Sequence, residues 1–501
     1  MKVFQRRALG SLVSLGVVLG VPAMAASCSS SSSSGPDDPP PTLDRQALLN
    51  PESCKKCHVN HYEQWSGSMH AYASEDPVFR AMNAKGQRET KGQLGDFCVK
   101  CHAPMAVREN ATKDGLNLDT VDKSLHGVTC YFCHSADKIE GTHNAQLGLS
   151  QDLVMRGSFE DPVKNTAHRS GFSVLHHRDR IESSDLCGSC HDIETGHGAK
   201  IERTYIEWKE SIFSQPPIGA TCGQCHMPQS TNKEPIAQYD GVFQRRTHDH
   251  SMVGVDVALT PFPHKKEQRE QIDSFLSTTL QSAICVSTAA GGAVRIILDN
   301  VGVGHHFPSG SSQDRRLWTE VVAYRGGRKI YESGVVADNV PATKNPDPDM
   351  WMMRDCIFDP AGVETHNFWE AASYEGNAMP GKLTFNPLDK RYYQTHVMQK
   401  YPRTGGILPE VPDKVTLRVR LRPMDVDVLE DLVNDKDKLL DPAVLKAVPT
   451  YDLNGTLTWT PETAKDDFID ASRQAYKCIT NTALNFNIET VVPIERKRCS
   501  P

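Results

Sequence analysis

Five copies of one short pattern, C-x-x-C-H, dominate this sequence. They read CKKCH, CVKCH, CYFCH, CGSCH and CGQCH, and they occupy residues 54–58, 98–102, 130–134, 187–191 and 222–226. Chance predicts roughly 0.02 copies of this pattern in a chain of such composition. Whatever the motifs bind therefore constrains the whole stretch between residues 54 and 226.

The spacing within each motif has a chemical reason. Two cysteines three residues apart reach the two vinyl groups of one porphyrin, and the histidine beside the second cysteine then lies under the iron as its proximal ligand. Zinc sites and disulfides are the alternatives, but structural zinc takes four ligands from paired units, and five units that each end in histidine do not pair. The motifs therefore predict five c-type haems. The thioether cysteines are Cys54, Cys57, Cys98, Cys101, Cys130, Cys133, Cys187, Cys190, Cys222 and Cys225, and the proximal ligands are His58, His102, His134, His191 and His226.

Composition agrees with a chain in which haem fills part of the core. Only 38% of the residues are hydrophobic and 7% are aromatic, and five closely spaced haems leave little room for apolar side chains. The formal net charge of -7 argues against nucleic-acid binding, which calls for a basic surface. Haem propionates add negative charge, so we expect redox partners to dock through basic residues. Other cytochromes or a membrane quinol-linked donor are the expected partners.

The N-terminus predicts export. Residues 1–27 combine early basic residues with an apolar run, as a signal peptide does. Two cleavage patterns compete: a small-x-small site at 23–25, and a lipobox-like AASC that ends at Cys28 but lacks the usual bulky residue. Residues 28–50 form a Ser/Pro-rich tether. We expect a protein of the periplasm or outer membrane, anchored by lipid at Cys28; a soluble exported protein is the alternative.

The rest of the chain predicts a mixed fold with two domains. Residues 51–283 are expected to form a pentahaem cytochrome domain of loops and short helices with little β-structure. Residues 284–501 are expected to form an all-β, sandwich-like domain, because 292–301, 315–334, 415–422 and 454–460 show strand patterns. The segment 415–422 alternates apolar and polar residues, which predicts one wet face. A helix is expected over 461–479 from its proline start and early acids.

Four further cysteines lie beyond the haem motifs, at Cys285, Cys356, Cys478 and Cys499. An exported protein meets an oxidising compartment. Two disulfides are therefore expected, and the three possible connectivities stay open.

The remaining histidines are candidates for the second axial position. The stretch CKKCHVNHYEQWSGSMHA resembles the opening of multihaem cytochromes related to the tetrahaem electron acceptor of hydroxylamine oxidoreductase. The resemblance covers 54 to about 250 and implies that His70, five residues after Trp65, ligates the third haem. It implies in the same way that His143 ligates the fourth haem, and that His250, preferred narrowly to His248, ligates the first.

This chain departs from the tetrahaem pattern by its motif at 222–226, so the second and fifth haems lack an implied ligand. His177 and His126 are the residues we select, and His176, His168 and His305 are further candidates. For each of them, a surface or hydrogen-bonded histidine is an equally good interpretation. His306 is a further possibility, in the segment NVGVGHHFPSG at 300–310.

The sequence also contains an internal repeat. Tyr62, Trp65, Ser68 and His70 recur in spacing as Tyr205, Trp208, Ser211 and Phe213. The second copy thus has phenylalanine where the first has histidine. Either the helix is reused for packing, or one haem has lost a ligand.

These observations predict an electron-carrying pentahaem cytochrome in which most haems have histidine on both sides. The alternative is an oxidoreductase that acts on a small nitrogen or sulfur compound at one open haem. The C-x-x-C-K variant of pentahaem nitrite reductase is absent, since all five motifs end in histidine. The catalytic residues of such an enzyme stay unknown from the sequence.

Overall fold

The computed structural model describes residues 42–289, 292–470 and 472–481. The expected signal peptide, most of the tether with Cys28, and Cys499 lie outside these ranges. Within them, no helix combines the length and the apolar character that a membrane span requires.

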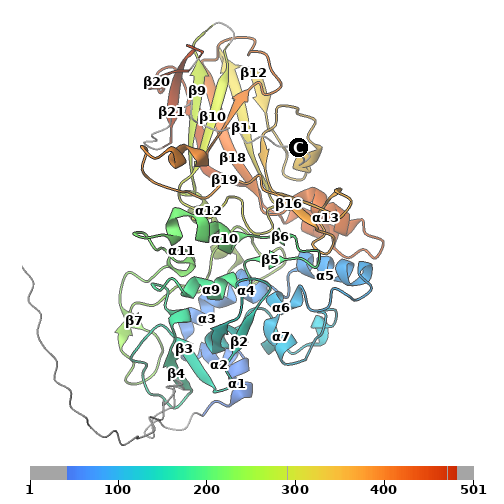
Figure 1. Cartoon of the computed structure of the whole chain (residues 1–501), viewed down its shortest axis with the longest axis vertical. Coiled ribbons are helices and arrows are strands. Elements are labelled where there is room, and N and C mark those ends of the chain that lie inside the picture. The colour runs from blue at the N-terminus through green and yellow to red at the C-terminus, as the bar shows by residue number, and fades with distance from the viewer. Residues whose placement is uncertain (1–41, 290–291, 471, 482–501) are drawn as a thin grey trace, which may run out of the picture. The chain divides into compact units, whose positions relative to one another are not determined.

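The motif region consists of short helices joined by loops (Figure 1). Local capping explains where several helices begin. Thr129 accepts a hydrogen bond from Phe132 N ahead of the third motif, and Thr221 forms a capping box with Gln224 ahead of the fifth. The helices of this region are α1 (Arg45–Leu49), α2 (Glu52–Lys55), α3 (Val59–Ser66), α4 (Met69–Tyr72), α5 (Pro77–Glu89), α6 (Val99–His102), α7 (Pro104–Arg108), α8 (Cys130–Ser135), α9 (Ser183–Gly188), α10 (Thr204–Glu210) and α11 (Cys222–His226).

Strands in the motif region are short and pair only two by two. They are β1 (Ala136–Ile139) with β2 (Leu147–Leu149), β3 (Val154–Gly157) with β4 (Arg169–Phe172), β5 (Ile193–Glu194) with β6 (Lys200–Ile201), and β7 (Glu234–Pro235) with β8 (Gln244–Arg245). A cluster of buried apolar side chains, which includes Leu48, Val99, Met105 and Phe132, also lies here. Protein side chains thus contribute a small core of their own beside the motifs.

The C-terminal region is built from antiparallel sheets. One five-stranded sheet has the order β17-β10-β9-β21-β20, and a second has β12-β11-β18-β19 with β13 beside β11. A three-stranded sheet has the order β15-β14-β16. The strands are β9 (Leu280–Ser287), β10 (Val294–Asn300), β11 (Arg316–Arg325), β12 (Arg328–Ser333), β13 (Met352–Met353), β14 (Cys356–Phe358), β15 (Glu364–Thr365), β16 (Ser373–Glu375), β17 (His396–Tyr401), β18 (Lys414–Arg422), β19 (Tyr451–Trp459), β20 (Asp466–Ile469) and β21 (Ala475–Thr480).

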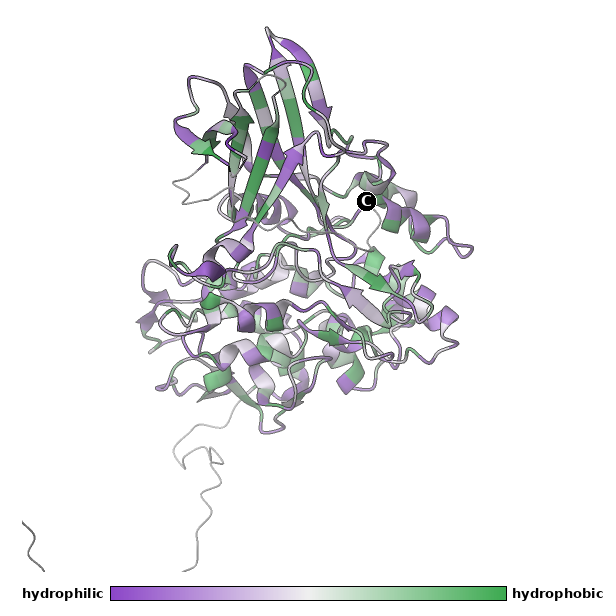
Figure 2. Ribbon diagram, turned by 45° about the horizontal axis from the view of Figure 1, so that its top comes forward, coloured by the Kyte–Doolittle hydropathy of each residue, from purple (hydrophilic) through white to green (hydrophobic). Residues whose placement is uncertain are grey.

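The main core lies between the two five-stranded sheets. It joins Ile284 and Ile296 of one sheet to Leu317, Leu417 and other residues of the second, and Figure 2 shows hydrophobic stretches along these strands. Helix α12 (Lys265–Leu276) packs Ile272 and Leu276 into the same core. The expected sandwich-like arrangement agrees with this packing, and residues 265–276 pack with the sheets.

Strand β18 differs from the expectation of one wet face. Arg420 is 8% exposed and Arg422 is fully buried. Both guanidinium groups lie 5.5 Å from the ring centre of Trp318, and Arg422 also pairs with Asp425. The last two arginines of the strand therefore form a buried charged layer, because the partner acids and the indole replace water around them.

The expected helix over 461–479 is wrong. This segment forms β20 and β21, and β21 pairs with β9 in the sheet. The reason is tertiary: Cys478 lies opposite Cys285 in that pairing, and the two form a disulfide. Cys356 is also disulfide-bonded. Of the possible pairings left open by the sequence, the structure thus selects one that joins Cys285 to Cys478.

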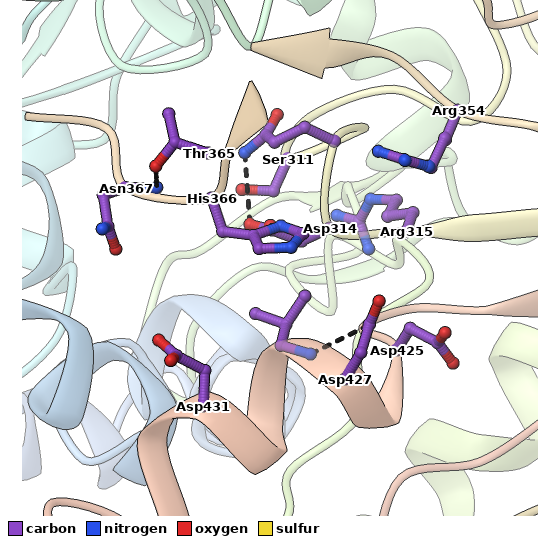
Figure 3. A network of polar contacts seen from close by, with 12 residues as sticks. Ser311, Asp314, Arg315, Arg354, Thr365, His366, Asn367, Asp425, Asp427 and Asp431 are labelled. Carbon is purple, nitrogen blue, oxygen red and sulfur yellow. Dashed lines mark hydrogen bonds and ion pairs between the residues drawn. The ribbon is translucent and has the colours of Figure 1, made fainter. Parts of the chain in front are cut away.

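Charged side chains join the motif region to the sheets. Lys85 and Arg88 of α5 pair with Asp431 and Asp435, at α13 (Val426–Val433) and just after it. Figure 3 shows the adjoining network, in which His366 and Asp314 lie side by side near Asp427 and Asp425. Arg316, fully buried, lies 3.1 Å from Asp427 and 3.5 Å from Asp425. These contacts hold the two regions in one packed unit.

Candidate haem sites

The motifs lie in or beside short helices. Helices α8 and α11 contain both cysteines and the histidine of their motifs, α6 contains one cysteine and the histidine, and α2 and α9 contain only the first cysteine of theirs. All ten motif cysteines, which are within the described residues, have free thiols. The thiols of different motifs touch one another: Cys54 lies within hydrogen-bond reach of Cys130, Cys101 of Cys190, and Cys187 of Cys222. The first and third motifs are therefore neighbours, and the fourth motif adjoins both the second and the fifth.

Backbone carbonyls orient most of the proximal imidazoles. The Nδ1 atoms of His58, His102 and His226 lie 2.8, 3.0 and 2.8 Å from carbonyl oxygens of Ile236, Ala73 and Val253. His134 is held in the same way by Arg156 at 2.5 Å. A carbonyl only accepts, so Nδ1 carries the hydrogen and the Nε2 lone pair stays free. This is the arrangement that a metal-binding imidazole needs.

Four of the five proximal rings face a second histidine at nearly one spacing. The ring centres are 6.2 Å apart for His58 and His168, 6.4 Å for His134 and His250, 6.1 Å for His191 and His70, and 6.4 Å for His226 and His305. Two imidazoles that each bind one metal from about 2 Å have ring centres about 6 Å apart. The spacing fits an iron between each pair.

The histidines that face the proximal rings are oriented by the same kind of hydrogen bond. The Nδ1 atoms of His168, His250 and His305 lie 3.0, 2.8 and 2.7 Å from backbone carbonyls, which again frees Nε2. Burial lowers the pKa of His70 and of His305 to about 3. Both rings are therefore neutral at pH 7, as ligation requires.

Another ring lies closer to His134 than His250 does. His176 stacks on His134 with ring centres 5.6 Å apart. Its Nε2, however, donates to the carbonyl of Cys133 at 2.7 Å. The Nε2 of His176 is thus already occupied, whereas that of His250 is free.

The second motif differs from the other four. Among the described residues, which include all twenty histidines of the chain, no ring contact of this kind joins His102 to another histidine. The ring of Phe79 instead stacks on His102, with ring centres 4.1 Å apart and an interplanar angle of 3°. A parallel stack at that distance covers the face of the imidazole and supplies no ligand.

The structure places the predicted second ligands as follows. His70 faces His191 of the fourth motif instead of His134 of the third. His250 faces His134 instead of His58. The Nε2 of His143 is 2.7 Å from the side-chain amide of Gln146.

The two residues selected for the second and fifth haems face no proximal ring in the structure. His177 accepts a hydrogen bond from Asp179 N through Nδ1. His126 is 6% exposed, neither of its ring nitrogens has a hydrogen-bond partner, and its Nδ1 is 3.5 Å from Glu75. Both therefore lie apart from the four facing pairs.

Sequence reasoning missed the position of His168 and did not choose His305. No spacing signal points to His168, since it lies in the loop that precedes β4 and reaches the first motif only through the fold. His305 follows Gly304, whose φ of +82° is a conformation that favours glycine. The glycines before His305 were therefore the available sequence signal.

Comparisons with known proteins find multihaem cytochromes. Residues 53–135 match the family model described as cytochrome c554 and c-prime. The multihaem cytochrome MtrC of Shewanella baltica (strain OS185) is 24% identical over 199 residues, which cover 37% of this chain and 25% of that protein. The chain thus spans about a quarter of the length of this curated relative.

A solved structure is similar in fold. The penta-heme cytochrome c552 from Thermochromatium tepidum aligns with a TM-score of 0.57 at 18% identity, over 83% of this chain and 99% of that one. Five C-x-x-C-H motifs, free motif thiols and proximal imidazoles with an available Nε2 point the same way. The cofactors of this chain are c-type haems, and the chain is similar to multihaem c-type cytochromes.

Proposed function

We propose that this protein is a pentahaem cytochrome that carries electrons between redox proteins outside the cytoplasm. The observation that carries the proposal is the set of four facing histidine pairs. With histidine on both sides an iron is six-coordinate, exchanges one electron at a time and offers no open position to a substrate. The protein supplies neutral, oriented imidazoles and keeps neighbouring sites in contact.

The contacts between motif thiols support a continuous route. The first and third sites adjoin, as do the fourth and fifth, and the second lies beside the fourth. Cys133 of the third motif interacts electrostatically with Cys190 of the fourth, which connects the two groups. Electrons entering at the first site can therefore reach the fifth through the third and fourth.

One observation favours a second candidate function. His102 lacks a facing histidine, so the haem of the second motif has a side on which a small nitrogen or sulfur compound could bind. In that case the other four sites would deliver electrons to it. This candidate is an oxidoreductase of the class that works at one open haem.

A single set of spectra tests both functions. The purified holoprotein is titrated for haem by the pyridine haemochrome method, and its EPR and optical spectra are recorded with and without carbon monoxide. We expect five haems per chain, of which four are low-spin and about one-fifth of the iron is high-spin and binds carbon monoxide. Fewer than five haems, or a high-spin majority, would contradict the electron-carrier proposal as stated.

The same spectra separate the two candidates. If all five haems are low-spin and carbon monoxide causes no shift, the second candidate is excluded, and the carrier function stands with an unidentified sixth ligand at the second motif. If carbon monoxide binds, turnover with nitrite, hydroxylamine or sulfite and a reduced electron donor decides whether the open position is used.

A further inference from the structure

The repeated helix of the sequence has the same surroundings in both copies. In α3, the hydroxyl of Tyr62 donates to Glu52, two residues before the first cysteine of the first motif. In α10, the hydroxyl of Tyr205 donates to Asp185, two residues before the first cysteine of the fourth motif. Each helix is thus tied through its tyrosine to the motif that precedes it.

The tryptophans tie each helix to a later motif. Trp65 Nε1 donates to the carbonyl of Val128 at 2.8 Å, and Trp208 Nε1 donates to the carbonyl of Ala220 at 2.8 Å. Val128 and Ala220 both stand two residues before the first cysteine of their motifs, the third and the fifth. We call the first motif, α3 and the third motif the first unit, and the fourth motif, α10 and the fifth motif the second unit.

The correspondence continues past the helix. The N–H of Val128 donates to the carbonyl of His70 at 2.8 Å, and the N–H of Ala220 donates to the carbonyl of Phe213 at 2.7 Å. The thiols of the two motifs are also in contact within each unit. The two units are therefore structural repeats, and Phe213 occupies the position of His70.

One position of the repeated helix carries an amide in the first unit and a carboxyl group in the second. In the first unit, Gln64 accepts the backbone N–H of His250 at 3.1 Å through Oε1. In the second unit, the equivalent Glu207 accepts from the hydroxyl of Ser309 at 2.6 Å and from the backbone N–H of His306. His250 faces the third proximal ring, and the neighbour of His306 faces the fifth.

We propose that Gln64 and Glu207 are equivalent positioning residues, which hold the loops that carry the sixth ligands of the third and fifth haems, and that only the second copy couples its haem to a proton. The inference rests on the proposed ligation by His250 and His305. It goes beyond that ligation because it assigns a function to the difference between the two copies.

The environment of Glu207 supports the second part. Glu207 is 5% exposed, and burial raises its pKa to about 8, with the nearby carboxylates of Asp355 and Asp192 acting in the same direction. As the pH rises through about 8 the side chain gains a negative charge, which would stabilise the oxidised form of the haem that His305 is proposed to ligate. The midpoint potential of the fifth haem should therefore fall as the pH rises through about 8. The titratable and charged groups around Glu207 are Asp192, Arg203, His306, Asp355 and Tyr374.

The experiment compares midpoint potentials of the holoprotein between pH 6 and pH 9, followed by optical and EPR spectra. Glu207→Gln should abolish the fall in the potential of the fifth haem, while its low-spin signal is retained because the amide still accepts the N–H. Gln64→Glu should introduce a corresponding fall at the third haem. Glu207→Leu, which removes the acceptor, should produce a high-spin fraction that binds carbon monoxide.

A His305→Ala variant identifies the signal of the fifth haem and separates the possible failures. If that variant leaves every low-spin signal intact, the proposed ligation is wrong. If it removes one signal, but Glu207→Gln leaves the pH dependence of that haem unchanged, the ligation stands and the present inference is overturned. A fall of the same size in wild type and in Glu207→Gln would assign the proton to another group.

Discussion

A hydrogen bond to a backbone carbonyl decides which nitrogen of an imidazole is available to a metal. His168, His250 and His305 all have Nδ1 bonded to a carbonyl, whereas His143 and His176 use Nε2 within the protein. Ring proximity alone would have favoured His176 over His250 beside the third motif. The tautomer is thus the better guide to ligation at the scale of single residues.

The relative orientation of facing rings makes a residue-scale prediction. The planes of His70 and His191 are 82° apart, whereas the other three pairs lie between 14° and 30°. Perpendicular ligand planes leave the iron orbitals nearly degenerate, so one haem should give a strongly anisotropic low-spin EPR signal. His70→Ala should remove that signal and add a high-spin one.

His143→Ala is the matched control for this prediction. It removes a histidine that the family resemblance implied for the same haem, but whose Nε2 contacts Gln146. Loss of the anisotropic signal in His143→Ala, and its persistence in His70→Ala, would reverse the assignment.

The sequence locates the proximal ligands more directly than the second ligands. The proximal histidine is covalently next to its cysteines, so the motif alone locates it. The proposed second ligand His168, which faces His58, comes from a distant loop whose position depends on the whole fold. Family resemblance implied His70 for the third haem and His250 for the first, whereas in the structure these rings face the fourth and the third proximal histidines.

Among the elements, β21 shows how a long-range link overrides a local pattern. The acids after Pro461 favour a helix start, yet β21 lies against β9 and is held there by the disulfide between Cys285 and Cys478. Sequence patterns identified β10, the β11–β12 hairpin, β18 and β19, because each has alternating or continuous apolar residues. They failed where a cross-link and pairing with a distant strand determined the structure.

Removing this disulfide should destabilise the sheets without disturbing the haem sites. The bond closes a loop with a sequence separation of 193 residues, and loss of a native disulfide typically costs about 2–5 kcal/mol. The double variant Cys285→Ser/Cys478→Ser should unfold at lower urea concentration, as measured by far-UV circular dichroism. Its haem absorption in the absence of denaturant should match wild type.

Thr480→Ser, on the same strand, serves as the control because it keeps the disulfide. An unchanged unfolding midpoint in the double cysteine variant would show that pairing of β21 with β9 holds without the covalent link.

At the scale of the whole molecule, the route of electrons and the attachment of the chain are separate questions. The N-terminal residues that bear on attachment lie outside the described part of the structure, so the expected lipid anchor at Cys28 stays a prediction. The acidic net charge of -7 would favour basic partners.

The anchor is tested by cell fractionation. In the bacterial host, wild-type protein should be recovered with the membranes, and Cys28→Ser should move to the soluble fraction with its haem content unchanged, because the motifs begin only at residue 54. Ser29→Ala, which leaves the acceptor cysteine in place, is the control. Equal recovery of both variants in the soluble fraction would contradict lipid attachment.

The two units differ in what the side chain at the position of His70 and Phe213 contacts. The first unit donates a histidine forward to the fourth motif, which belongs to the next unit. At the same position of the second unit, Phe213 lies against Phe385 and the loop of Gly304. The first unit thus supplies a ring to a proximal histidine of the second unit, whereas the second unit places an apolar ring at the same position and supplies none from it.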